Sequence, residues 1–328
     1  MRKKIAALCL LLLLCGCAQQ ETQVPTAPAT VPDTASAEPM VTMPPAVASE
    51  AAALVEAPPP PSGVVLEAEA SAEKEERCDD AVVDYSHTED GYIMARYLGQ
   101  TEKKLKIRVF GPTTTYTYNL PAGQWTVFPL SDGNGTYKAA VYINTHDSKY
   151  ALVMSAEFEV ELKDEFAPFL RPNQYVDYSC APGTVEKGAL LCAGLEHPLE
   201  KVAAVYDFVV GTFSYDYDRA ATVKSGYLPV LDDVLVEEKG ICFDYAAVMA
   251  AMLRSQEVPC KLVVGYAGDT YHAWISVWTE ENGWIDGAIF FDGHMWKRMD
   301  PTFASSGQRS DEIMDFIEHG SYTAKYLY

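Results

Sequence analysis

A long segment near the N-terminus cannot form a packed core, and it confines the fold to the rest of the chain. Residues 18–76 are rich in Pro, Ala, Glu, Val and Thr and contain no aromatic residue. Such a segment buries too little apolar surface to offset the entropy lost on folding. We therefore expect residues 17–77 to be a disordered tether with an r.m.s. reach of roughly 40 Å. The remaining residues, about 250, are enough for two domains.

Residues 1–16 have the pattern of a secretory signal peptide. The basic residues Arg2–Lys4 precede an apolar segment, 5–14, that is too short to span a bilayer. The following Leu14-Cys15-Gly16-Cys17 resembles a bacterial lipobox. We expect cleavage after Gly16 and lipidation of Cys17, with an uncleaved signal anchor as the alternative. Two or three acyl chains would then hold the exported protein on the outer face of the bacterial cell membrane, or in the outer membrane or periplasm of a Gram-negative host.

Residues 78–165 alternate short β-rich segments with turns. This spacing predicts an antiparallel β-sandwich of immunoglobulin-like shape. The expected strands are 92–97, 105–110, 114–120, 125–129, 136–144 and 151–162. Several tyrosines of these strands could either stack on carbohydrate or simply pack in the core: Tyr116, Tyr118, Tyr137, Tyr142 and Tyr150.

The second domain, residues 166–328, contains a cysteine at the predicted start of a helix. After Gly240, apolar residues recur with helical spacing up to Leu253. Cys242 then lies at the helix N-terminus, where unpaired N–H groups and the helix dipole favour thiolate over thiol. Its own N–H could stabilise an oxyanion. The alternative is that Cys242 is only a small buried apolar residue.

A histidine follows in a segment that is typical of a β-strand. His272 opens the run 272–278, which is rich in aromatic and β-branched residues, and the run 261–266 predicts a neighbouring strand. An imidazole on a strand that faces a helix terminus can take a proton from a thiol and later give it to a leaving amine. The third member of such a site is Asp300 or, as a rival, Asp286. We expect His294 to be an exposed turn residue within an additional hairpin at 287–296.

Three motifs resemble the core domain of the transglutaminase-like superfamily, over roughly residues 199–302. They are Gly240-x-Cys242-x-Asp244-Tyr245-Ala246, His272-Ala273-Trp274 and Asp300-Pro301-Thr302. The resemblance implies an α+β fold, with a helix packed on an antiparallel sheet, and a papain-like catalytic triad of Cys242, His272 and Asp300. It also implies that an upstream aromatic residue, Tyr215 or Tyr217, could help bind the oxyanion, although groove lining or packing is the alternative.

Cofactors and several classes of partner are not expected. The sequence has no metal-binding spacing of Cys or His, no phosphate-binding loop and no dinucleotide fingerprint. The formal net charge of −21 argues against nucleic acid as a partner and against docking on an anionic membrane. Five cysteines remain beyond the leader, which allows one free nucleophile and at most two disulfides.

Three functions are compatible with the sequence. The first is a thiol acyltransferase or amide hydrolase that acts on protein or peptide amides through a cysteine thioester. The second is a cysteine peptidase that acts on cell-wall peptides or surface proteins. The third is a surface-binding module without catalytic activity. The sequence predicts neither an oligomeric state nor the choice between water and an amine as the acyl acceptor.

Overall fold

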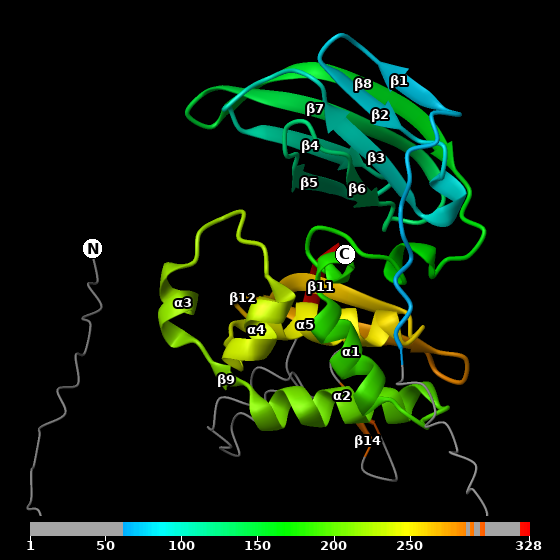
Figure 1. The fold of residues 1–328 in the computed structure, drawn as a ribbon, viewed down its shortest axis with the longest axis vertical. Coiled ribbons are helices and arrows are strands. Elements are labelled where there is room, and N and C mark those ends of the chain that lie inside the picture. Colours follow the sequence, from blue (N-terminus) through cyan, green and yellow to red (C-terminus); the bar gives the residue numbers. More distant parts are fainter. Residues whose placement is uncertain (1–61, 287–288, 292–295, 299–321) are drawn as a thin grey trace, which may run out of the picture. The chain divides into compact units, whose positions relative to one another are not determined.

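The structure is a computed structural model that describes residues 62–286, 289–291, 296–298 and 322–328 (Figure 1). The predicted signal peptide, the lipidation site Cys17 and most of the predicted tether lie outside these residues. Asp300 and His294 lie outside them as well. None of the described helices is both long and apolar enough to cross a membrane.

The first part of the described chain forms two four-stranded antiparallel sheets. Alternation of side chains is clear in Leu105–Phe110, where every second residue is buried. The first sheet has the order β1 (Glu75–Arg77), β2 (Ala81–Asp84), β3 (Tyr92–Tyr97) and β6 (Thr126–Pro129). The second has the order β5 (Thr115–Asn119), β4 (Leu105–Phe110), β7 (Gly135–His146) and β8 (Lys149–Val160).

Three of the five tyrosines considered for carbohydrate stacking are core residues. Tyr116, Tyr118 and Tyr137 are each at most 2% exposed. The ring of Tyr118 lies 5.3 Å from that of Phe128, and the ring of Tyr137 lies 6.2 Å from that of Phe158. These tyrosines therefore pack in the core, and the packing alternative is confirmed for them.

The end of the expected tether is part of the folded structure. Residues 75–77 form β1, which pairs with β2, and the N–H of Val64 donates to the carbonyl of Ser255 at 2.7 Å. The segment has a polar composition that gives no strand signal. It is ordered by main-chain pairing with distant residues, which a local sequence pattern does not reveal.

Five α-helices occur in the second part of the described chain. Most of them are short. The longest are α2 and α5, and α5 begins at Cys242, as the sequence predicts. The helices are α1 (Pro182–Leu191), α2 (Pro198–Thr212), α3 (Tyr217–Thr222), α4 (Leu231–Glu237) and α5 (Cys242–Ser255).

Helix α5 packs against an antiparallel sheet, which confirms the α+β architecture of this domain. The sheet has the order β13 (Gly283–Asp286), β12 (Thr270–Thr279), β11 (Cys260–Ala267) and β16 (Tyr322–Leu327). Gly265 allows β16 to come close, because an added Cβ would lie 2.0 Å from the Thr323 carbonyl oxygen. Two short pairs complete the fold: β9 (Ser214–Tyr215) with β10 (Lys239–Gly240), and β14 (Ile289–Phe291) with β15 (Trp296–Arg298), the expected additional hairpin.

Helix α5 is buried on all sides over residues 244–255. At its C-terminal end, the fully buried guanidinium of Arg254 donates to three main-chain oxygens. These belong to Cys260 (2.8 Å), Arg171 (2.8 Å) and Tyr328 (2.5 Å). Burial lowers the pKa of Arg254. One side chain thereby joins α5 to β11, to the segment before α1 and to the residue that follows β16.

Candidate active site

Cys242 is the first residue of α5, as the sequence predicts. The preceding Ile241 has an extended backbone, with φ −99° and ψ 175°, so the chain turns sharply into the helix at the cysteine. At the first helical position the main-chain N–H points out of the helix and has no intrahelical acceptor. The thiol is half-buried. Its position therefore combines access with the positive end of a 14-residue helix.

Asp244 fixes the start of this helix. Its Oδ2 accepts a hydrogen bond from the N–H of Ile241 at 2.8 Å, the return contact of a helix cap. The side chain folds back over Gly240, where an added Cβ would lie 2.6 Å from the Cβ of Asp244. Gly240 and Asp244 are thus required together, which gives a physical reason for the Gly-x-Cys-x-Asp spacing.

Two further side chains hold the buried Asp244 carboxylate. The Tyr227 hydroxyl donates to Oδ1 at 2.7 Å, and Arg219 Nη1 lies 3.4 Å from Oδ2. Arg219 also pairs with Asp216 and Glu237. Burial raises the pKa of Asp244, and these donors oppose that shift. Sequence reasoning did not assign Asp244 this role, although an acidic residue at the third helical position is a known capping signal.

We expect Asp244→Asn to destabilise the protein by about 1–3 kcal/mol, because an amide cannot accept from all three donors that now contact the carboxylate. The matched control is Asp218→Asn, since Asp218 is exposed in the first turn of α3, and its effect should stay below about 0.5 kcal/mol. Urea unfolding of both variants gives the two free energies. Equal midpoints would contradict the capping role of Asp244.

His272 lies on β12, as predicted, and is 5% exposed. The imidazole stacks on the Trp274 ring, with centroids 6.5 Å apart and planes 23° apart. On the neighbouring strand its register partner is Gly265, the position at which β16 approaches. Both the stacking and the sheet pairing restrict the orientation of the ring.

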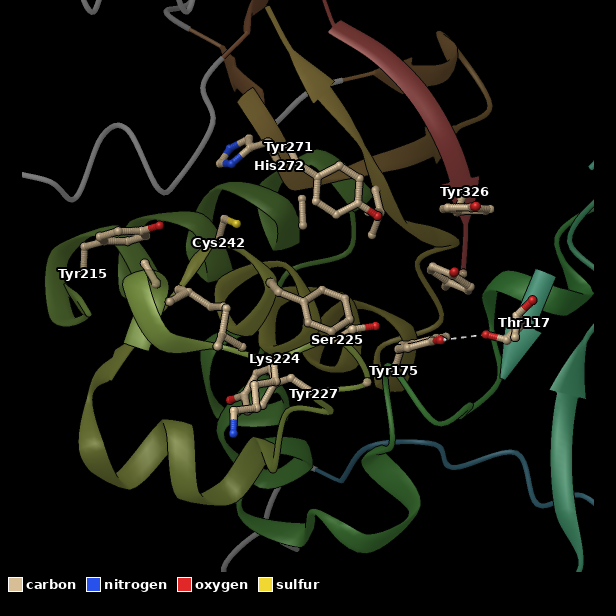
Figure 2. A pocket seen from close by; sticks show the side chains of 18 residues that line it. Thr117, Tyr175, Tyr215, Lys224, Ser225, Tyr227, Cys242, Tyr271, His272 and Tyr326 are labelled. Carbon is tan, nitrogen blue, oxygen red and sulfur yellow. Dashed lines mark hydrogen bonds between the residues drawn. The ribbon is translucent and has the colours of Figure 1, made fainter. Parts of the chain in front are cut away.

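A cavity of about 600 Å³ contains both Cys242 and His272 among its lining residues. Figure 2 shows the sulfur of Cys242 directed to the side of the cavity on which the His272 imidazole lies. The two side chains come from α5 and from β12, which are adjacent in the fold. The structure thus brings together two of the predicted catalytic residues at one cavity.

Asp286, the rival third residue, is directed to a different partner. Its Oδ1 accepts a hydrogen bond from the Ser276 hydroxyl at 2.7 Å, and the two residues are opposite each other in β13 and β12. Ser276 lies four residues beyond His272, or about 13 Å along a strand. Asp300, the preferred third residue, falls outside the described residues and stays a prediction.

Of the two upstream tyrosines, Tyr215 lines the cavity and Tyr217 does not appear in its lining. Tyr215 on β9 is the register partner of Gly240 on β10, and Gly240 lies two residues before Cys242. Tyr217 is 60% exposed and packs edge-on against Tyr215, with centroids 5.0 Å apart. Tyr217 therefore supports the Tyr215 ring from outside the cavity.

All five cysteines of the described residues are free thiols. Cys192 and Cys260 are buried, and burial raises the pKa of Cys260 to about 12. Cys180 is exposed and Cys78 is half-buried. Cys180 is therefore a natural reference thiol for Cys242 in one protein. Within the described residues no cluster of His, Cys, Asp or Glu is suited to hold a metal ion.

The described geometry can be compared with known proteins. Residues 189–287 match the sequence profile of the transglutaminase-like superfamily. A protein-glutamine gamma-glutamyltransferase of Pseudomonas aeruginosa is 28% identical over 118 residues, which cover 31% of this chain and 15% of that protein. The uncharacterized protein YebA of Bacillus subtilis is 26% identical over 110 residues, or 27% of this chain and 15% of that protein.

Solved structures give a more distant likeness. A candidate cysteine protease from Cytophaga hutchinsonii has 14% sequence identity and a TM-score of 0.37, and the match covers 72% of this chain and 83% of that one. The chain spans only 15% of the length of the curated relatives that it matches. The superfamily profile covers α2 to β13 and includes both Cys242 and His272. Over residues 189–287, this chain carries a domain of the transglutaminase-like superfamily.

Proposed function

We propose that this protein is a thiol enzyme that transfers or hydrolyses acyl groups from protein or peptide amides. The observation that carries the proposal is that Cys242 and His272 line the same cavity, with Cys242 at the first position of α5. The glutamine-specific name of the Pseudomonas aeruginosa relative makes the side-chain amide of glutamine the first donor to test.

In the proposed reaction, His272 takes the thiol proton and Cys242 Sγ attacks the amide carbon. The negative oxygen that forms is stabilised by the outward-pointing N–H of Cys242 and by the positive end of α5. The C–N bond then breaks, His272 gives its proton to the leaving amine or ammonia, and a thioester remains. Water or a second amine then attacks the thioester carbon while His272 takes its proton. The C–S bond breaks, and His272 returns the proton to Sγ, which regenerates the thiol.

Asp300 completes the proposed triad as the residue that orients His272 and supports its charged form. The bonding of Asp286 to Ser276 favours Asp300 over Asp286, because that carboxylate already has a partner at a distance from His272. Tyr215 is proposed as part of the wall near the oxyanion. Peptide-bond cleavage is the second candidate reaction of the same site, since the chemical steps are shared.

The activation of Cys242 is tested by alkylation. With limiting iodoacetamide and peptide mapping, Cys242 should react faster than the exposed Cys180 at pH 6–7, because His272 can take the thiol proton and the start of α5 stabilises negative charge on the sulfur. In a His272→Ala variant this advantage should disappear while Cys180 reacts as before. Equal alkylation rates at the two thiols of the unmodified protein would contradict the proposed site.

We also propose that the protein is exported and anchored through lipidated Cys17, and that residues 78–165 form an immunoglobulin-like sandwich. The order of β2, β3 and β6 in one sheet, with β5, β4, β7 and β8 in the other, supports the sandwich. A Cys17→Ala variant is expected to lose radiolabelled fatty acid and to leave the membrane fraction. Retention of the label on that variant would exclude Cys17 as the lipid site.

A further inference from the structure

The lining of the Cys242 cavity has an unusual composition for this chain. Asp and Glu make up 46 of 328 residues, about one in seven, yet neither occurs among the described residues that line the cavity. Six of the eighteen lining residues are tyrosines: Tyr175, Tyr215, Tyr227, Tyr271, Tyr326 and Tyr328. The part of the lining that the structure describes is thus aromatic and contains no carboxylate, in an acidic protein.

The aromatic residues form a continuous wall on one side of the cavity. The ring centroid of Tyr175 lies 4.2 Å from that of Tyr328 and 5.8 Å from that of Phe243, and Tyr326 stacks on Tyr328 at 6.1 Å. Figure 2 shows Tyr271, Tyr326 and Tyr175 succeeding one another from the region of Cys242 and His272 toward Thr117.

Two tyrosine hydroxyls of the cavity lining already form hydrogen bonds within the protein. The Tyr175 hydroxyl donates to the carbonyl of Thr117 at 3.3 Å, and the Tyr227 hydroxyl donates to Asp244. Burial raises the pKa of Tyr175 to about 12 and the pKa of Tyr328 further, so these phenols stay neutral. The wall therefore offers ring surface to a ligand, without a charge.

An ammonium group is a poor occupant of this cavity. Tyrosine rings attract cations, but an ammonium that leaves water also needs a carboxylate or several acceptors, and the described lining contains no carboxylate. Lys224 adds a positive charge to the lining. A carboxylate on the ligand is not strongly favoured either. Lys224 is exposed, and one exposed ion pair contributes little binding free energy.

We propose that this cavity binds an uncharged apolar or aromatic group of the acyl donor, next to the amide that reacts, and disfavours an ammonium group in the same place. The proposal rests on the proposed function for the identity of the donor. Burial of a phenyl-sized group against such a wall should favour it about ten- to hundred-fold over a group that leaves the wall empty.

The test uses alkylating reagents whose rates at Cys242 show which groups the cavity accepts. It requires no acyl transfer. Matched chloroacetamides carry a phenethyl, an ethyl or an aminoethyl group. The thiolate attacks the CH₂ carbon, an S–C bond forms, the C–Cl bond breaks and chloride leaves. Peptide mapping of the full chain gives the rates at Cys242 and at the exposed Cys180, whose ratio removes the intrinsic reactivity of each reagent.

The phenethyl reagent is expected to give a Cys242-to-Cys180 ratio at least about ten times that of the aminoethyl reagent. Tyr326→Ala should reduce this preference, and Tyr150→Ala, a tyrosine on β8 outside the lining, should leave it unchanged. Tyr271→Ala is a second variant of the aromatic wall. It should change the free energy of unfolding little, because Tyr271 is 54% exposed. Lys224→Glu should raise the rate of the aminoethyl reagent.

Equal ratios for the three reagents, or a preference for aminoethyl, would overturn the proposal. A phenethyl preference that persists in both wall variants would overturn it as well. Failure of the proposed function looks different: the reagents would discriminate at Cys242 as expected, while glutamine peptides with a neighbouring Leu or Phe would release no ammonia and transfer no acyl group.

Discussion

Cys242→Ala is expected to lower kcat for amide turnover by at least about four orders of magnitude, because removal of the nucleophile of a triad eliminates the covalent route. The fold should be unaffected, since Cys242 is half-buried and the cap of α5 is formed by Asp244. Ammonia release from a glutamine peptide and formation of an isopeptide with an added amine measure the two possible outcomes of the thioester. Thermal unfolding measures the fold.

The matched control is Cys180→Ala, which removes an exposed thiol that is outside the cavity lining. Its kcat should equal that of the unmodified protein. A Cys242→Ala variant that retained activity would refute the thiol mechanism, whichever residue completes the triad. Cleavage of a peptide bond in place of ammonia release would instead favour the peptidase reaction of the same site.

Arg254→Ala is expected to destabilise the protein by at least about 3 kcal/mol. The variant leaves three buried main-chain oxygens without their donor, and each such group costs about 1–3 kcal/mol. It also leaves a cavity at the end of α5. For a folded part of this size the loss corresponds to a fall in Tm of roughly 6–12 °C.

Two controls separate the donors from the charge. Arg108→Ala removes an arginine of β4 that lies over the Phe110 ring at 4.6 Å, and should shift Tm by only about 2–4 °C. Arg254→Lys keeps the charge but cannot reach three oxygens with one ammonium, and should behave much like Arg254→Ala. If Arg254→Lys were as stable as the unmodified protein, the stabilisation would come from the positive charge and not from the several N–H donors of the guanidinium.

Local patterns predicted the elements that carry the site. Helical spacing after Gly240 predicted α5, and the aromatic and β-branched run after His272 predicted β12, because both elements have regular packing partners that fix their periodicity. The same reasoning could not predict β16, which pairs with β11 across more than fifty residues. Strand pairing at such a distance leaves no mark on the sequence of either strand.

The chemistry of the site was predicted in part. Cys242 and His272 were recognised from their settings, and both line one cavity. The support of Asp244 by Arg219 and Tyr227 was not predicted, because it joins α3 and the loop before α4 to the start of α5 and depends on tertiary structure. The gathering of six tyrosines around the cavity was also not predicted, since they come from five separate segments of the chain.

The burial of α5 over residues 244–255 has a consequence for the dynamics of the site. Its amide protons, over residues 244–255, are shielded on all sides and should exchange with deuterium only when the whole domain unfolds. The exposed residues 223–226, which also line the cavity, should exchange far faster. The thiol is therefore attached to a helix that should stay closed to exchange, while residues on the rim of its cavity exchange freely.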